Sequence, residues 1–297
     1  MGALVNIIEQ FKKLTQGNVF EGKFLFILGS GRSGNTLTRK LLVERYRIYI
    51  PPETYVIAPA LMTFNRTPHL RWEERVRLVL SAFEYQETYE IISMNGLYPV
   101  FKQCVQLPDE KRTFGHILQI IWGFWGREAG IDFDLPGDKT PYNMASINVI
   151  SRAFPNAYYL FITRHPYDVC ASYVKMGRYT DYVSAARRWD MAHRNWLKLQ
   201  RRNPKIKSMF LRYEELVFEP ATYVSEIGAW LGVENRSVNL GEDVSWGDFH
   251  VYGHLSAVKS EVNTDSVGRG KKSLSQEDQR QIKNIVSEMS NEFHHDL

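Results

Sequence analysis

Short, nearly unbroken apolar runs alternate along this chain with stretches of helical periodicity. The apolar runs are Phe24 to Leu28, Arg47 to Ile50, Tyr158 to Thr163 and Ser208 to Arg212. They are rich in aromatic and β-branched residues, as is typical of strands buried on both faces of a sheet. Between them, apolar residues recur at helical spacing. The predicted helices are Asn35 to Glu44, Tyr142 to Phe154, Pro166 to Lys175, Ser184 to Arg201 and Ala221 to Leu231.

This alternation predicts an α/β fold, with a parallel sheet flanked by helices on both faces. An aromatic-rich, mostly helical stretch at about residues 55–135 follows the second strand, and we expect it to be an acceptor-side insertion that covers the sheet's ligand edge. The segment Gly241 to Arg269 has little periodicity, which is typical of a late lid loop. Because the chain has no internal repeat or linker, we expect a single domain over residues 1–297.

Composition narrows the classes of partner and compartment. The net charge of +4 suits an anionic small molecule and is too weak to indicate nucleic acid. The two cysteines, Cys104 and Cys170, are too few for a disulfide framework, which favours a cytoplasmic location. No signal-peptide pattern is visible in Met1 to Leu14, and no apolar stretch reaches the roughly 18 residues of a membrane span. The sequence does not indicate an oligomeric state.

A glycine-rich turn, Gly29 to Thr36, links the first predicted strand to the first predicted helix. Backbone N–H groups and the helix dipole converge on an anion at such a junction. Its glycines and threonine fit the Walker A pattern, but Asn35 stands where that pattern has lysine. No predicted strand ends in an aspartate that would hold Mg²⁺, since Tyr158 to Thr163 is followed by Arg164. The turn therefore favours binding of a 5′-phosphate without metal-assisted NTP hydrolysis, with Arg32 supplying positive charge.

A second anion site is predicted where the strand Tyr158 to Thr163 ends. Arg164 follows this strand, and Ser172 lies eight residues later, about two turns into the next helix. Pro166 fits the first helical turn, so Arg164 is expected at the strand's carboxyl end, where ligands bind in open α/β sheets. An arginine and a serine at this edge can clamp a second phosphate.

These segments together resemble the PAPS-dependent sulfotransferases, whose fold is a nucleotide-kinase-like parallel sheet with a P-loop-like turn. Gly31 to Thr36 is similar to the loop that holds the 5′-phosphosulfate of 3′-phosphoadenosine 5′-phosphosulfate (PAPS). Its form is that of the tyrosylprotein-like and bacterial small-molecule enzymes, except that Asn35 replaces the usual threonine. Arg164 and Ser172 resemble the pair that binds the 3′-phosphate, the group that distinguishes this donor from ATP.

Two later segments extend the resemblance. Tyr213 matches a tyrosine that follows a core strand and lies near the adenosine. Ser266 to Lys272 is similar to the loop that closes over the 3′-phosphate, although Gly270 replaces the usual aromatic residue. The resemblance thus implies these donor-binding residues: Gly31, Arg32, Ser33, Gly34, Asn35, Thr36, Arg164, Ser172, Tyr213, Arg269 and Lys271.

The resemblance also implies a mechanism and its catalytic residues. Glu53 lies 21 residues after Arg32, where the tyrosylprotein-like branch carries its general base. An acceptor oxygen or nitrogen would attack sulfur in line, and Glu53 would take the acceptor's proton. Arg32, Lys139 and Ser266 would stabilise the charge on the leaving adenosine 3′,5′-bisphosphate (PAP). The scheme needs no metal.

Histidines are alternative bases, because another branch of the family uses histidine in this role. His250 and His254 lie in the predicted lid loop, and His254 competes directly with Glu53. His165 is more simply a helix-start residue beside Pro166.

Other functions remain open from sequence alone. A nucleotide kinase-like, NTP-using enzyme is disfavoured by Asn35. An RNA-binding protein would use the arginine-rich helix, but neither alternative explains two anion sites on adjacent strands. The expected acceptor is a ring-bearing or cationic small molecule, such as a natural product intermediate, with peptidyl and carrier-bound acceptors as alternatives. The arginines of that helix are Arg187, Arg188, Arg194, Arg201 and Arg202.

Overall fold

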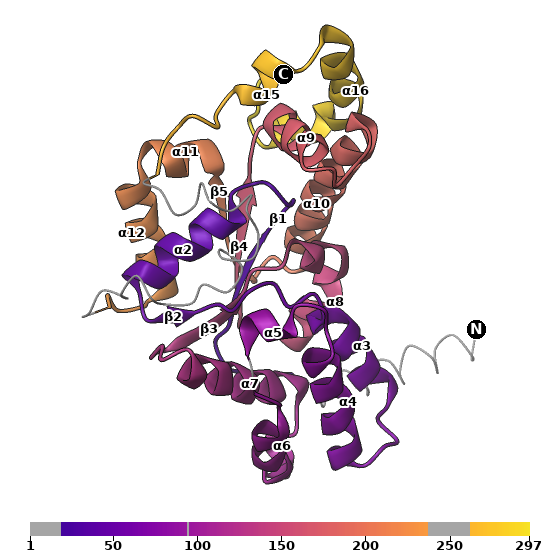
Figure 1. The fold of residues 1–297 in the computed structure, drawn as a ribbon, viewed down its shortest axis with the longest axis vertical. Helices are drawn as coiled ribbons and strands as arrows, with labels where there is room; N and C mark the ends of the chain where they lie inside the picture. Colours follow the sequence, from indigo (N-terminus) through magenta and orange to yellow (C-terminus); the bar gives the residue numbers. More distant parts are fainter. Residues whose placement is uncertain (1–18, 94, 237–261) are drawn as a thin grey trace.

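The computed structural model of the chain describes residues 19–93, 95–236 and 262–297. Within these residues, a five-stranded sheet has the order β2-β3-β1-β4-β5, and every adjacent pair of strands is parallel (Figure 1). Helices flank the sheet, which confirms the predicted α/β fold class. The strands are β1 Leu25–Gly29, β2 Ile48–Tyr49, β3 Leu135–Asp138, β4 Tyr158–Thr163 and β5 Lys207–Arg212.

The central strand β1 lies between β3 and β4. Leu25 pairs with Gly137 on one side and with Tyr158 on the other. Because the strands are parallel, the carboxyl ends of β1, β3 and β4 meet at one edge of the sheet. β3 is absent from the sequence prediction, and it ends in Asp138. The expectation that no strand ends in an aspartate was therefore wrong.

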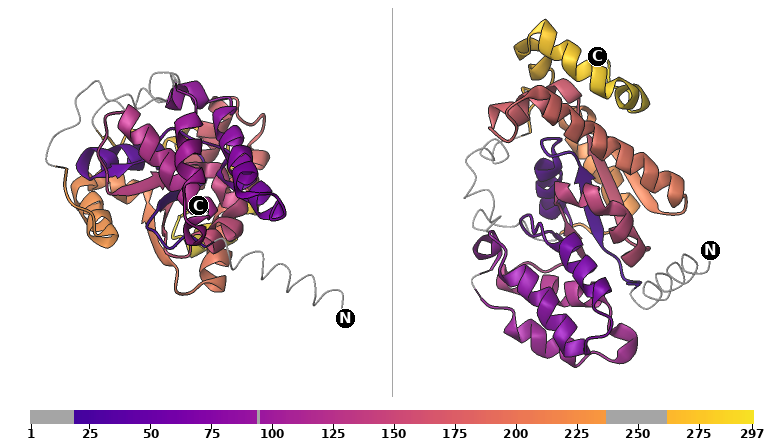
Figure 2. Two further views of the ribbon diagram at one scale, coloured as in Figure 1. Left: turned by 90° about the horizontal axis from the view of Figure 1, so that it is seen from below. Right: turned by 90° about the vertical axis from the view of Figure 1, so that its right-hand side faces the viewer.

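Alternate residues of β1 point to opposite faces, and each face has its own core. Leu25 and Ile27 pack with apolar residues of α2, α11 and α12, whereas Phe26 and Leu28 pack with residues of α8, α9, α10 and α16. The side view shows the strands between α2 in indigo and α10 in salmon (Figure 2). These helices are α2 Asn35–Arg45, α8 Ile147–Ala153, α9 Pro166–Lys175, α10 Tyr182–Arg202, α11 Tyr213–Phe218, α12 Pro220–Leu231 and α16 Gln276–Glu292.

The aromatic-rich stretch between β2 and β3 is helical, as predicted, and forms the lower body in Figure 1. Its large aromatic residues are core residues, since Phe83, Trp122 and Trp125 are fully buried and in mutual ring contact. Tyr55, Thr88 and Ile91 of this stretch line the cavity described below. The acceptor-side role expected for the insertion stays a prediction. Its elements are α3 Ile57–Arg66, α4 Trp72–Glu84, α5 Tyr89–Ile92, α6 Tyr98–Val105, η1 Asp109–Lys111 and α7 Phe114–Glu128.

The segment after β3 begins with a 3₁₀ helix, η2 Pro141–Ser146, which continues into α8. Most of the predicted lid loop, including His250 and His254, lies outside the described residues. Its described end leads into the short helix α15 Arg269–Ser273. Within the described residues, no helix is both long and apolar enough to cross a membrane.

A buried polar network lies at the end of β4. The Thr163 hydroxyl contacts Nε2 of His193 at 2.6 Å and Nε2 of His295 at 2.9 Å. Nδ1 of His193 lies 2.7 Å from the carbonyl oxygen of Trp189, which can only accept, so Nδ1 carries the proton. Nε2 of His193 therefore accepts a hydrogen bond from the Thr163 hydroxyl. The indole of Trp189 donates to the carbonyl of Arg164 at 2.9 Å, which fixes the backbone there.

Candidate active site

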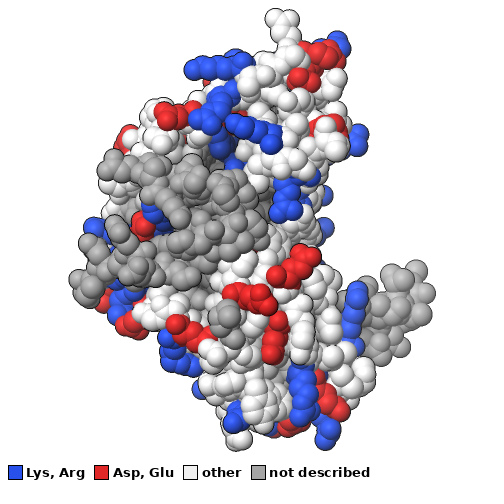
Figure 3. All heavy atoms as spheres, viewed as in Figure 1, with Lys and Arg blue, Asp and Glu red and all other residues white. Residues whose placement is uncertain are grey.

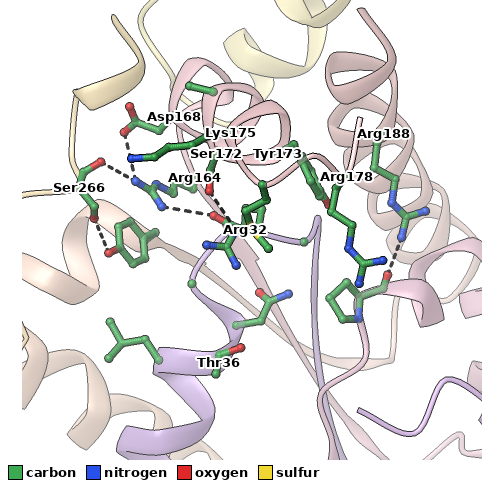
Figure 4. Close-up of a pocket in the computed structure, with 18 of the residues that line it drawn as sticks. Arg32, Thr36, Arg164, Asp168, Ser172, Tyr173, Lys175, Arg178, Arg188 and Ser266 are labelled. Carbon is green, nitrogen blue, oxygen red and sulfur yellow. Dashed lines mark hydrogen bonds and ion pairs between the residues drawn. The ribbon is translucent and has the colours of Figure 1, made fainter. Parts of the chain in front are cut away.

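A cavity of about 1170 Å³ opens at the carboxyl edge of the sheet. Residues from the turn after β1, the segment after β2, η2, α9, the start of α10 and the chain around α15 line it. Figure 4 shows that Arg32 lies centrally, between Arg164 on one side and Arg178 on the other. On the outer surface, Lys and Arg side chains gather over α9 and α15 (Figure 3).

The turn after β1 has the backbone of an anion cradle. Arg32 has a φ of 68° and Gly34 a φ of 96°, both in the left-handed region. Gly34 is the N-cap of α2 and provides no side-chain cap, so the first N–H groups of α2 are left for a ligand. A Cβ at Gly34 would lie 2.2 Å from the Tyr213 ring, which is why glycine is required.

Two polar side chains brace this turn from within. Asn35 donates through Nδ2 to the carbonyl of Ser30 at 3.3 Å, and the Ser33 hydroxyl lies 3.2 Å from that of Ser30. Asn35 lines the cavity together with Gly31 and Thr36, whereas the Ser33 side chain is buried within the turn and is not among the lining residues. Asn35 thus shapes the turn instead of bringing a charge to it.

The two predicted anion sites lie side by side. Nε of Arg32 donates to the Ser172 hydroxyl at 2.9 Å, and Nη1 of Arg164 donates to the carbonyl of Arg32 at 3.3 Å (Figure 4). Burial lowers the pKa of Arg32, and the positive charge of Arg164 lowers it further. An anion bound here would offset the repulsion between the two guanidinium groups. Within the described residues, the buried Nε of Arg164 has no hydrogen-bond partner.

The late segment before α15 meets this pair of arginines. Nη2 of Arg164 donates to the carbonyl of Ser266 at 2.5 Å, and its guanidinium lies 4.4 Å from the centre of the Tyr213 ring. The Tyr213 hydroxyl lies 2.7 Å from that of Ser266. The structure therefore brings Arg164, Tyr213 and Ser266 together, although 102 residues separate Arg164 from Ser266.

Asp168, which the sequence analysis did not single out, holds this late segment in place. Its carboxylate accepts the N–H of Gly268 at 2.9 Å and that of Gly270 at 2.5 Å, and it lies 3.7 Å from Nη2 of Arg164. A Cβ at Gly270 would lie 2.3 Å from the carbonyl of Tyr167, so glycine here permits the close approach to α9. The only local signal was the four-residue spacing of Asp168 from Arg164 on α9.

The two basic residues of α15 differ in position. Arg269 lines the cavity and donates to the carbonyl of Asp265 at 3.1 Å. Lys271 is exposed and is not among the cavity-lining residues, so its predicted donor contact stays a prediction.

Glu53 and Lys139, predicted separately, form one ion pair. Nζ of Lys139 lies 2.6 Å from Oε1 of Glu53, and the two side chains are 1% and 21% exposed. Glu53 follows β2 and Lys139 follows β3, so the pair stands on adjacent strands. Glu53 lines the cavity, whereas Lys139 does not line it and lies behind Glu53, to which it is paired.

Asp138, which precedes Lys139, is fully buried, and its carboxylate accepts hydrogen bonds from neighbouring side chains. It accepts from Thr54 at 3.2 Å, Thr140 at 3.1 Å and Asn143 at 2.6 Å. Burial raises its pKa to about 6. These bonds fix the chain on either side of the Glu53 and Lys139 pair, which gives Asp138 a positioning role.

A profile of the sulfotransferase family matches residues 25–237, which is well over half of the chain. The chain belongs to the sulfotransferase family. No curated protein matches it in a sequence comparison.

Solved structures agree with this sulfotransferase fold. The sulfotransferase domain from the Synechococcus PCC 7002 olefin synthase has a TM-score of 0.59 at 22% identity, covering 94% of this chain and 96% of that one. The sulfotransferase domain from the curacin biosynthetic pathway has a TM-score of 0.53 at 20% identity, covering 94% and 100%. Sulfotransferase STF9 from Mycobacterium avium has a TM-score of 0.50 at 14% identity, covering 98% and 81%.

Tyrosines form much of the sulfotransferase cavity beyond Arg32. Tyr55 and Tyr142 pack edge to face with ring centres 5.8 Å apart, as do Tyr173 and Tyr179 at 5.1 Å. Tyr182, at the start of α10, also lines the cavity. The sequence analysis placed the aromatic-rich stretch of about residues 55–135 on the acceptor side, and Tyr55 from that range lines the cavity. The tyrosine-rich run after Ser172 was the signal that it missed.

His165 points away from this cavity. Its Nδ1 accepts the N–H of Tyr167 at 3.3 Å, and its Nε2 lies 2.8 Å from the carbonyl of Asp296. It is not among the cavity-lining residues, so the helix-start role expected from its position beside Pro166 fits the structure.

Proposed function

We propose that this sulfotransferase moves a sulfuryl group from PAPS to a hydroxyl or amine of a small-molecule acceptor and releases PAP. The observation that carries the proposal is the contact of the two anion sites, through Arg32 with Ser172 and Arg164 with the Arg32 carbonyl. One ligand with phosphates at both ends of an adenosine ribose would engage both sites. The N-terminus of α2, which has no side-chain cap, and Nε of Arg164, which has no hydrogen-bond partner among the described residues, fit such a donor.

The donor contacts divide between the two ends of the ligand. The backbone from Gly31 to Thr36 and the Arg32 guanidinium are assigned to the 5′-phosphosulfate. Arg164 and Ser172 are assigned to the 3′-phosphate, and Tyr213 to the neighbourhood of the adenosine. Arg269 and Lys271, in the late loop, are assigned to binding the 3′-phosphate as well. Arginine is suited to both ends because its guanidinium binds phosphate oxygens in pairs.

In the transfer step, the acceptor's oxygen or nitrogen bonds to sulfur while the bond from sulfur to the PAP oxygen breaks. We assign the acceptor's proton to Glu53, whose Oε1 is held by Lys139 at 2.6 Å. Arg32 and Ser266, which line the cavity, would stabilise the negative charge that grows on the departing oxygen, and Lys139 would contribute its positive charge from behind Glu53. His254 is the alternative base, and it lies outside the described residues.

A natural product intermediate is the acceptor class that we favour. Support comes from the similar sulfotransferase domains of the olefin synthase and the curacin biosynthetic pathway. Peptidyl and carrier-bound acceptors are alternatives on the acceptor side. An NTP-using enzyme is the alternative on the donor side, and Asn35, hydrogen-bonded to Ser30 within the turn, disfavours it.

We also propose a cytoplasmic location with no nucleic-acid or membrane partner. Support comes from the two cysteines, which are both free and buried, and from the small net charge.

Calorimetric titration with PAP and with ADP tests the proposed donor. We expect micromolar binding of PAP and at least tenfold weaker binding of ADP, because only PAP carries a 3′-phosphate for Arg164. Arg164→Ala should abolish this preference, whereas Arg201→Ala on the exposed end of α10 should preserve it. Equal affinity of the wild-type protein for PAP and ADP would disprove the donor assignment.

A further inference from the structure

The cavity extends past Arg32 to a second group of arginines that the donor does not need. Arg178 lies between α9 and α10, and Arg188 lies on α10; both line the cavity. In Figure 4 they lie on the side of Arg32 opposite to Arg164 and Ser266. The charge of Arg178 is close enough to Arg32 to contribute to lowering its pKa. Positive charge thus continues from the proposed donor site into the part of the cavity beyond Arg32, where the acceptor would bind.

The two arginines are held differently. Nη2 of Arg188 donates to the carbonyl of Pro141 at 3.1 Å, and its guanidinium lies 4.8 Å from the centre of the Tyr142 ring. This fixes Arg188 against the tyrosine wall. Arg178 is exposed at the cavity. Among the described residues, no acidic side chain forms an ion pair with either arginine.

In the part of the chain that the structure describes, the acidic side chains that line the cavity either bond to protein groups or lie in the late loop. Asp168 is bonded to the late loop, and Asp265 lies in that loop beside Ser266. Glu53 is the acceptor-side carboxylate, and Lys139 pairs with it at 2.6 Å. Among the described residues, the part of the cavity around Arg178 and Arg188 therefore has unbalanced positive charge, which favours an anionic acceptor over a cationic one.

We propose that Arg178 and Arg188 form an anion subsite for the acceptor. The inference rests on the proposed function, because it assigns Arg32 and Arg164 to the donor. The acceptor would then be an organic acid or a phosphate monoester that also carries the hydroxyl or amine to be sulfated. Its apolar body would lie against the tyrosines, and its carboxylate or phosphate would be bound by the guanidinium donors.

Calorimetry on the PAP-saturated protein tests this subsite, because PAP occupies the donor site first. The probes are benzoate and inorganic phosphate, with neutral benzyl alcohol for comparison. The variants are Arg178→Gln and Arg188→Gln, and the matched control is Arg187→Gln, an exposed arginine of α10 that does not line the cavity. Each variant's affinity for PAP is measured first.

We expect at least one of the two anions to bind the wild-type PAP complex with millimolar affinity and at least tenfold more weakly in Arg178→Gln and Arg188→Gln. Arg187→Gln should bind it like the wild type, and benzyl alcohol should not distinguish Arg178→Gln from the wild type. PAP affinity should stay within about twofold in Arg178→Gln.

The failures of the inference and of the proposed function are distinguishable. If PAP binds but neither anion has a lower affinity for Arg178→Gln than for the wild-type protein, the subsite is refuted while the donor assignment stands. A loss of PAP affinity in Arg178→Gln as large as the loss of anion affinity would place Arg178 in the donor site and also refute the inference. Failure of the wild-type protein to bind PAP would refute the proposed function and the inference with it.

Discussion

Replacing Asp168 with asparagine should weaken PAP binding by loosening the late segment. In the wild-type protein, the two carboxylate oxygens accept the N–H groups of Gly268 and Gly270 and face the Arg164 guanidinium. Asparagine keeps one acceptor oxygen, but its NH₂ group must face the other backbone N–H. The variant also loses the negative charge beside Arg164. The segment that carries Ser266 is then held less firmly against α9.

The magnitude follows from the lost contacts. A hydrogen bond to a charged group contributes about 1.5–3 kcal/mol, and Asp168→Asn removes one and weakens the other. We therefore expect the docked state of the segment to lose about 2 kcal/mol, which corresponds to about a thirtyfold change in an equilibrium constant. Because PAP binds the docked state, its apparent affinity is proportional to the fraction of molecules that are docked. For a segment whose docked and undocked states are near balance in the free wild-type protein, a loss of about tenfold to thirtyfold is expected.

The assay is calorimetric titration with PAP and with AMP, which lacks the 3′-phosphate. The loss should be large for PAP and within about threefold for AMP, since the turn after β1 does not contact Asp168. Asp265→Asn is the matched control, because it makes the same change in the same segment on an exposed side chain. Wild-type affinity for PAP in a folded Asp168→Asn protein, or equal losses for PAP and AMP, would refute the reasoning.

Two further outcomes are expected. Glu53→Gln should keep PAP affinity and lose at least about a hundredfold in turnover of PAPS, measured as PAP release, because the amide cannot accept the acceptor's proton; near-normal turnover would move the base to His254 or elsewhere. Burial lowers the pKa of His193 to about 3, so below pH 6.5 the unfolded chain binds a proton that the folded protein does not. In urea unfolding, the wild-type protein should lose about 2 kcal/mol more stability than His193→Gln between pH 7 and pH 5, and equal pH dependence of the two proteins would contradict this.

The parts of the fold that local patterns specify were predictable from the sequence. The bounds of β4 and α9 were predicted as the structure has them, because a continuous apolar run and a proline-initiated helix are local signals. β3 was missed because Pro136 and Gly137 are poor strand residues. Its strand conformation comes from pairing with β1 and β2, which only the folded sheet provides.

The candidate site likewise has features that local sequence patterns predicted and features that depend on residues far apart in the chain. The turn after β1 and the Arg164 to Ser172 spacing are local, and the structure places them together. The role of Asp168 depends on residues about 100 positions later, so no local pattern could reveal it. Aromatic residues alone did not separate core from cavity. Trp122 and Trp125 are buried in the core of the helical insertion, whereas tyrosines such as Tyr142 line the cavity, where their hydroxyl groups can form hydrogen bonds with water.

A crystal structure of the protein with bound PAP is the most direct test that one donor spans both anion sites. The 5′-phosphate should lie over the N-terminus of α2, with the backbone from Gly31 to Thr36 around it. The 3′-phosphate should lie within hydrogen-bond distance of Arg164 and Ser172. A PAP molecule whose 3′-phosphate lies away from both residues, or whose 5′-phosphate lies outside the turn after β1, would contradict the account.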